Sequence, residues 1–242
     1  MARRRSSESA NITGNTARKL RSPELMAAVA GLALVLLAVG GSAYLLARSG
    51  GSRPDDLLVG ADDTASVHQS KRESVFGLLD QTVDETLPHG SHVVFWSFDV
   101  NAHQFANLVP SHINDLWPTE DAIMSLHPTT FGTHPGTALN NMIPRLAVDR
   151  EKKRPAIVML LTDGEDQAPD ETKGALVQIA ANPDVKAVWF CGVTSRNGFR
   201  SLLDRRWRPL LGSRLIISSR NDGAEALNRL TALLHAKIPG EN

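Results

Sequence analysis

Short apolar runs alternate with helix-like segments along most of this chain, and that alternation restricts the possible folds more than any other feature. The apolar runs are Leu57–Ala61, His92–Phe98, Pro155–Thr162, Lys186–Val193 and Leu215–Ile217. Continuous apolar runs of this length are typical of strands that are buried on both faces. Strands separated by helices form a parallel sheet with helices on both sides. We therefore expect an α/β fold with a doubly wound, mostly parallel, Rossmann-like sheet.

The segments between these runs predict the helices. Residues 66–87 place Val75, Phe76, Leu79 and Val83 on one apolar stripe, as expected of a helix that packs against the sheet. Further helices are expected at 119–126, from about 138 onward with a disturbance at Pro144, and at 170–181, 198–204 and 223–236. Residues 104–109 predict a weak edge strand, and 127–136 a loop rich in Pro, Gly and Thr.

A second constraint is the uncharged run at residues 25–47. It is long enough to cross ~30 Å of hydrocarbon as a helix. The six basic residues before it are Arg3, Arg4, Arg5, Arg18, Lys19 and Arg21, whereas Asp55 and Asp56 follow soon after it. The positive-inside rule predicts a single-pass protein of the inner membrane, with a cytoplasmic N-terminus and an extracytoplasmic domain. A cleaved secretory signal is the alternative, although its apolar core is usually shorter, about 7–15 residues.

The chain divides into four parts on this basis. Residues 1–22 are expected to be a disordered cytoplasmic tail, 25–47 a transmembrane helix, 49–54 a linker and 55–238 the folded domain. The formal net charge of the whole chain is zero, but residues 49–242 carry 19 Lys and Arg against 24 Asp and Glu. A mildly acidic domain argues against nucleic-acid binding, which usually needs a basic surface.

Three polar segments lie where strands are expected to end or helices to begin. They are Asp62-Asp63-Thr64-Ala65-Ser66, Gly136-Thr137 and Thr162-Asp163-Gly164. In a sheet of order 3-2-1-4-5-6, the first and fourth strands are neighbours at the point where the order reverses, which is where such sheets bind ligands. Asp62 and Asp163 are therefore expected to lie side by side, with Asp62 facing solvent. Their carboxylates, with nearby hydroxyls, form an oxygen-only set that suits a hard cation such as Mg²⁺.

Together these segments resemble the metal-ion-dependent adhesion site of the von Willebrand factor type A (vWA) domain, in its membrane-anchored bacterial type. The resemblance extends over about residues 55–238. The family has an Asp-x-Ser-x-Ser motif, a Thr on a second loop and an Asp in a Thr-Asp-Gly turn. Here the matching residues are Asp62, Thr64, Ser66, Thr137 and Asp163, with Thr64 in place of the first Ser.

The resemblance implies the roles of these residues. Thr64, Ser66 and Thr137 would bind Mg²⁺, Mn²⁺ or Ca²⁺ directly, and Asp62 and Asp163 would hold its bound waters. A partner protein would then supply an Asp or Glu carboxylate to the open position, so the domain would bind proteins, with no small-molecule substrate and no catalysis. Two alternatives are a structural subunit of an envelope assembly that needs no metal, and a Mg²⁺-dependent hydrolase.

Simpler explanations exist for several of these residues. Asp62 could cap the following helix, and Thr162-Asp163-Gly164 could be an ordinary turn. His134 could line the rim of the metal site or be a plain loop residue. The arginine-rich region around Trp207 could contact a partner or lipid headgroups, or could be a solvated face. It contains Arg196, Arg200, Arg205, Arg206, Arg208, Arg214 and Arg220.

Overall fold

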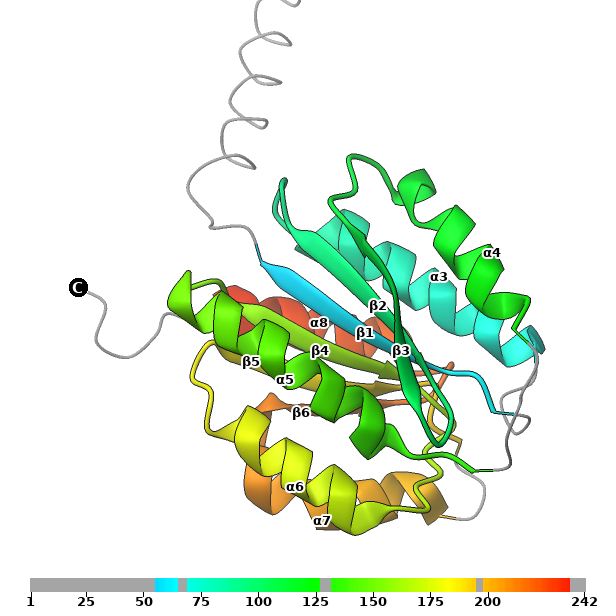
Figure 1. The fold of residues 1–242 in the computed structure, drawn as a ribbon, viewed down its shortest axis with the longest axis vertical. Helices are drawn as coiled ribbons and strands as arrows, with labels where there is room; N and C mark the ends of the chain where they lie inside the picture. The colour runs from blue at the N-terminus through cyan, green and yellow to red at the C-terminus, as the bar shows by residue number, and fades with distance from the viewer. Residues whose placement is uncertain (1–54, 65–68, 127–131, 195–197, 236–242) are drawn as a thin grey trace, which may run out of the picture. The chain divides into compact units, whose positions relative to one another are not determined.

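Six strands form a single sheet in the order β3-β2-β1-β4-β5-β6 (Figure 1). The structure is a computed structural model that describes residues 55–64, 69–126, 132–194 and 198–235. The strands are β1 (Asp56–Asp62), β2 (His92–Phe98), β3 (Ala102–Leu108), β4 (Ala156–Leu161), β5 (Val185–Cys191) and β6 (Leu215–Ser218). All neighbouring pairs are parallel except β2 and β3. The predicted mostly parallel sheet and its strand order are therefore confirmed.

Helices cover both faces of the sheet (Figure 1). They are α3 (Gln69–Thr86), α4 (Trp117–Met124), α5 (Pro135–Glu151), α6 (Pro169–Ala180), α7 (Phe199–Leu211) and α8 (Gly223–His235), with 3₁₀ turns at Ile113–Asp115 and Gly212–Arg214. Leu58 packs with residues of α5, α6 and α7 on one face. Leu57 and Val59 pack with residues of α3, α4 and α8 on the other face. Because successive strand side chains point to opposite faces, a strand buried on both faces must be apolar at every position.

Two helices continue through a proline. The disturbance expected at Pro144 does not end α5, and α7 extends past the predicted end at 204, through Pro209, to Leu211. A proline leaves the carbonyl four residues earlier without its helical partner. Those carbonyls belong to Asn140 and Arg205, which are exposed residues, so water can satisfy them. Buried Trp207 and Leu211 hold the last turns of α7 against the core.

A cluster of charges closes the end of the sheet where β1 begins. Asp56, which is fully buried, accepts hydrogen bonds from Arg145 on α5 and from Arg154 just before β4. Arg145 also pairs with buried Asp149, one helical turn further along α5. These contacts tie the start of β1 to α5 and to the start of β4.

The predicted tail (1–22), membrane span (25–47) and linker (49–54) lie outside the described residues, as does Ser66. Among the helices that the structure describes, none is long and apolar enough to cross a bilayer.

Candidate metal-binding site

The polar segments after β1 and β4 meet at the carboxyl ends of these two strands. The register pairs Ala61 of β1 with Leu161 of β4, so the next residues along, Asp62 and Thr162, lie beside each other. Asp163 follows immediately and lies close enough for its charge to act on Asp62. The structure therefore places the two carboxylates together at the expected edge of the sheet.

Hydroxyl groups fix the Asp62 carboxylate in position. Its Oδ1 accepts hydrogen bonds from the Thr64 backbone N–H at 3.0 Å and from the Thr64 hydroxyl at 2.6 Å. Its Oδ2 accepts a hydrogen bond from the Thr162 hydroxyl at 2.8 Å. Asp62 is only 2% exposed, so the expectation that it faces solvent is wrong. Thr64 and Thr162 contact its two oxygens, and the carboxylate lies inside the protein rather than on its surface.

Burial changes the chemistry of this carboxyl group. Burial raises the pKa of Asp62 to about 7, hydrogen bonds from Thr64 and Thr162 oppose the rise, and the charge of Asp163 adds to it. A desolvated carboxylate next to a second carboxylate favours its neutral form. A cation bound nearby would reverse this preference, because it compensates both charges at once. Two ionised carboxylates at this position are thus unfavourable without a cation, and a divalent ion beside them would be favourable.

A third segment brings Thr133 to the same place. Thr133 donates a hydrogen bond from its hydroxyl to the Thr64 hydroxyl oxygen at 3.3 Å, and both residues are buried. The loop that carries it is held by two backbone bonds: the His134 N–H donates to the Asp99 carbonyl at 2.9 Å, and the Gln167 N–H donates to the Thr133 carbonyl at 3.0 Å. Thr133 therefore connects the loop before α5 to the ends of β1 and β4.

Thr137, which the sequence suggested for this role, is engaged elsewhere. Its hydroxyl donates to the His134 carbonyl at 2.8 Å in the first turn of α5. The sequence contains two Gly-Thr pairs, Gly132-Thr133 and Gly136-Thr137, four residues apart. Pro135 could have distinguished them, because proline favours the first position of a helix and so leaves Thr133 in the loop.

The turn after β4 positions Asp163. The Gly164 N–H donates to the Thr162 hydroxyl at 3.2 Å, and the Glu165 N–H donates to Asp163 Oδ1 at 3.1 Å. Gly164 has a φ of 96°, a left-handed conformation that favours glycine, and a Cβ atom there would lie 2.8 Å from Val193 Cγ1. The Thr-Asp-Gly sequence is therefore needed for the shape of this turn, whatever else Asp163 does.

His134 lies at the edge of the site, directly after Thr133. Its Nδ1 is 4.0 Å from Glu171 Oε2 on α6, and both side chains are partly exposed. Asp166, three residues after Asp163, is close enough for the charge of His134 to act on its carboxyl group. His134 thus has acidic neighbours.

The donor atoms of this site fit a hard cation. Within the described residues, no three His, Cys, Asp or Glu side chains gather as a ligand set. A cation here would accordingly be held by the hydroxyls of Thr64 and Thr133, by water, and by the charge of Asp62 and Asp163. Such an oxygen-only set with few protein ligands suits Mg²⁺, which keeps several of its waters.

Comparison with solved structures identifies the fold. A von Willebrand factor type A protein from Catenulispora acidiphila superimposes with a TM-score of 0.54 at 13% identity, over 77% of this chain and 44% of that one. Proximal thread matrix protein 1 from the mussel byssus, in a structure with a zinc-occupied MIDAS motif, superimposes with a TM-score of 0.53 at 16% identity. The superposition covers 75% of this chain and 48% of that one. This chain has the vWA fold. The fold expected from the sequence is confirmed.

A third vWA-fold neighbour is the PilB minor pilin from Streptococcus sanguinis, with a TM-score of 0.54 at 12% identity, over 78% of this chain and 64% of that one. This chain thus spans about half to two thirds of the length of these structures. No protein-family model matches the sequence, and no curated protein matches it.

Proposed function

We propose that this chain is a membrane-anchored vWA protein that binds a partner protein through a divalent cation. One observation carries the proposal: the hydroxyls of Thr64 and Thr133 meet at 3.3 Å beside the buried Asp62 carboxylate. These two residues are 69 positions apart in the sequence, yet both hydroxyls reach the same edge of the sheet. Ser66 is the remaining ligand that the family resemblance implies.

Neutral hydroxyl ligands explain how such a site would attract a partner. A cation held by Thr64, Thr133 and Ser66 keeps most of its positive charge, because hydroxyls carry no negative charge of their own. Asp62 and Asp163 orient the bound waters and provide partial compensation. An Asp or Glu side chain of a partner completes the coordination, and exclusion of water strengthens that contact. The proposed cation is Mg²⁺, with Mn²⁺ and Ca²⁺ as substitutes, and the domain lies outside the inner membrane, anchored by residues 25–47.

The arrangement favours binding over hydrolysis. Both oxygens of Asp62 already accept hydrogen bonds from Thr64 and Thr162, so this carboxylate is not presented as a nucleophile. The backbone N–H of the next residue, Asp63, donates a hydrogen bond to the Phe98 carbonyl at 3.0 Å. We therefore propose a module without catalytic activity.

Two threonine variants test the metal site directly. Thr133→Val removes one hydroxyl with little change of shape, and Thr137→Val is a matched control four residues away. In the full chain in detergent, Mg²⁺ is expected to raise the thermal midpoint because it binds the folded state. The shift should be lost in Thr133→Val and kept in Thr137→Val. If Mg²⁺ instead still raises the thermal midpoint of Thr133→Val but not that of Thr137→Val, Thr137 is the metal ligand and Thr133 is not.

Partner capture gives the functional readout. The wild-type chain is used as bait in detergent extracts, with Mg²⁺ or with a chelator, beside the Thr133→Val variant. Proteins that are recovered only with Mg²⁺, and only by the wild type, support a metal-dependent contact. Equal recovery under all conditions would instead support the metal-independent structural subunit.

A further inference from the structure

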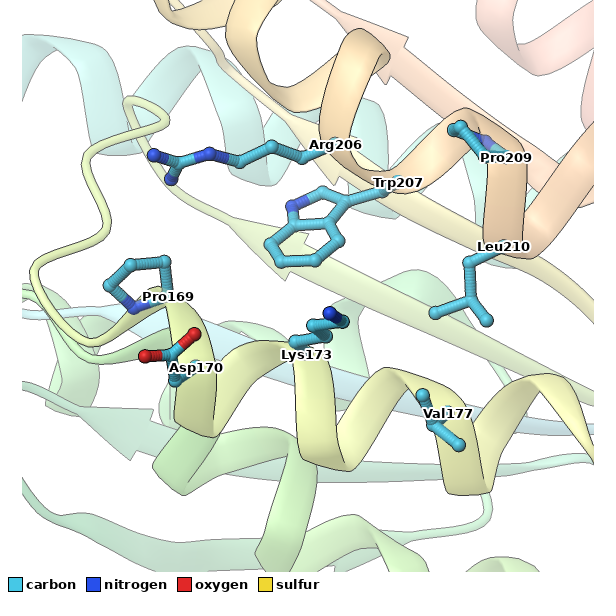
Figure 2. A pocket seen from close by; sticks show the side chains of 8 residues that line it. All are labelled: Pro169, Asp170, Lys173, Val177, Arg206, Trp207, Pro209 and Leu210. Atoms are coloured by element: carbon cyan, nitrogen blue, oxygen red, sulfur yellow. The ribbon is translucent and has the colours of Figure 1, made fainter.

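A groove with an amphipathic lining lies between α6 and α7, two of the helices on the face of the sheet that α5 also covers (Figure 2). Its volume is ≈ 440 Å³, within the range of about 300–1,000 Å³ that is typical of sites for small ligands. The lining residues from α6 are Pro169, Asp170, Lys173 and Val177, and those from α7 are Arg206, Trp207, Pro209 and Leu210. No part of the proposed metal site contributes to this groove.

Trp207 forms the floor of the groove. Figure 2 shows its indole ring extending from α7 toward α6, between the side chains of Arg206 and Lys173. The residue is 3% exposed, and its indole N–H has no hydrogen-bond partner among the described residues. The N–H itself is fully covered, so a ligand in the groove would contact the ring and not this donor.

The two ends of the groove differ in character. Figure 2 places Val177, Leu210 and Pro209 together at one end. Val177 is 47% exposed, which is unusual for an aliphatic side chain beside an apolar floor. An apolar side chain of a ligand would find its contacts at this end.

The charged end has an excess of one positive charge. Lys173 and Arg206 are exposed, and neither forms an ion pair or hydrogen bond with another described residue. Asp170 provides the single negative charge of the lining. By contrast, Arg200 and Arg208 on the same helix are already paired, with Asp222 and Asp204. The groove therefore offers an anionic group Lys173 and Arg206, and the charge of Arg206 also acts on the Asp166 carboxyl nearby.

We infer that this groove binds a short peptide segment of a partner protein, in which an apolar side chain lies next to a carboxylate. The apolar side chain packs on Trp207 between Val177 and Leu210, and the carboxylate pairs with Lys173 and Arg206. An apolar end next to the charged end favours a peptide side chain over a lipid headgroup, which needs only surface charge. The inference does not depend on the metal site, and it is tested in the presence of a chelator.

The experiment uses the indole N–H signals of the full chain in detergent micelles, with ¹⁵N in its tryptophan side chains. The sequence has four Trp, and the signal lost in Trp207→Phe belongs to the groove. The probe is the peptide acetyl-Leu-Gly-Glu-amide, and the two comparison peptides replace Leu by Ala or Glu by Gln. Acetyl-Gly-Leu with a free C-terminal carboxylate tests whether a chain terminus or an acidic side chain is the preferred source of the anion.

We expect the Trp207 signal to move in a saturable way with the Leu-Gly-Glu peptide and less with either comparison peptide. Arg206→Glu should weaken the binding on the order of tenfold or more, whereas Arg205→Glu, on the same helix but outside the groove, should leave it unchanged. The other three indole signals report that each variant is folded. A Trp207 signal that does not move, or equal effects of Arg206→Glu and Arg205→Glu, would overturn the inference. So would equal binding of the Glu and Gln peptides.

Discussion

The Thr162 hydroxyl donates a 2.8 Å hydrogen bond to Asp62 Oδ2, although the two residues are 100 positions apart in the sequence. The same hydroxyl oxygen accepts a hydrogen bond from the Gly164 N–H at 3.2 Å. Thr162 therefore links the turn that carries Asp163 to the carboxylate at the end of β1. The two acidic residues are held at a fixed separation by a side chain that need not touch the metal.

Thr162→Val should weaken metal binding without removing a ligand. The loss of this hydrogen bond leaves one oxygen of a buried carboxylate unsatisfied, which should lower the free energy of unfolding by about 1–3 kcal/mol. The affinity for Mg²⁺ should fall about 10–100-fold, as is usual when a group that orients a metal site is lost. Calorimetric titration of Mg²⁺ checks the affinity, and urea unfolding with a chelator checks the stability. Unchanged affinity together with reduced stability would make Thr162 a purely structural residue.

Arg145→Met should strongly destabilise the domain. The variant leaves the fully buried Asp56 with only Arg154 as a partner, and it removes the partner of Asp149. Removal of one member of a buried charge cluster costs about 3–5 kcal/mol. Arg150→Met is the control, because Arg150 is exposed on the same helix and should change the stability by no more than about 0.5 kcal/mol. Equal urea midpoints for the two variants would show that the cluster contributes little.

Two glycine variants should have opposite effects. A Cβ atom at Gly60 in β1 would lie 2.7 Å from Leu160 Cδ2 and 3.2 Å from Met142 Cε, so Gly60→Ala should lower the stability by about 1–3 kcal/mol. Gly77 lies in α3, and a Cβ atom added there would meet nothing within 4 Å, so Gly77→Ala should raise the stability by about 0.5–1 kcal/mol. Urea midpoints of the two variants provide the measurement. A stabilised Gly60→Ala would mean that α5 can move away from β1 at low cost.

The stability of the domain should fall as the pH rises from about 4.5 to 8, partly because of Glu120. Burial, and then the charge of neighbouring Asp80 on α3, raises the pKa of Glu120 to about 8 from a usual 4.5, and adjacent Asp121 adds to the rise. The folded state thus keeps a proton that the unfolded state releases, and stability falls with pH across that interval. Glu120→Gln should make the fall of stability with pH shallower, and it should stabilise the domain relative to the wild type near pH 8.

Some decline should remain in Glu120→Gln, because burial also raises the pKa values of Asp55 and Asp149 to about 7. Urea unfolding at several pH values gives the slope, with the exposed Glu151→Gln as a control that should leave the slope unchanged. A slope equal to that of the wild type in Glu120→Gln would show that Glu120 is ionised in the folded state.

Long-range order was easier to predict from this sequence than local side-chain geometry. The alternation of apolar runs and helices predicted a parallel sheet, and the strand order assumed for such a sheet brought Asp62 near Asp163. Whether Thr133 or Thr137 lies beside Thr64 depended on where α5 begins, and the two residues are only about one helical turn apart. The burial of Asp62 could not be predicted either, because it depends on how side chains far apart in the sequence, such as those of Thr64 and Thr162, pack around one carboxylate.

The position of β1 in the middle of the sheet has a mechanical consequence. Seven of its residues are paired with β2 and six with β4, from the charge cluster at Asp56 to the candidate site at Asp62. If residues 25–47 anchor the chain and a partner pulls at Asp62, the load runs along this one strand from end to end. The covalent backbone of β1 then carries the tension between its two ends, and the hydrogen bonds to β2 and β4 hold the strand in place without lying in the path of the load. With the proposed anchor and partner in place, this strand would transmit the tension between them while the rest of the domain bears little of it.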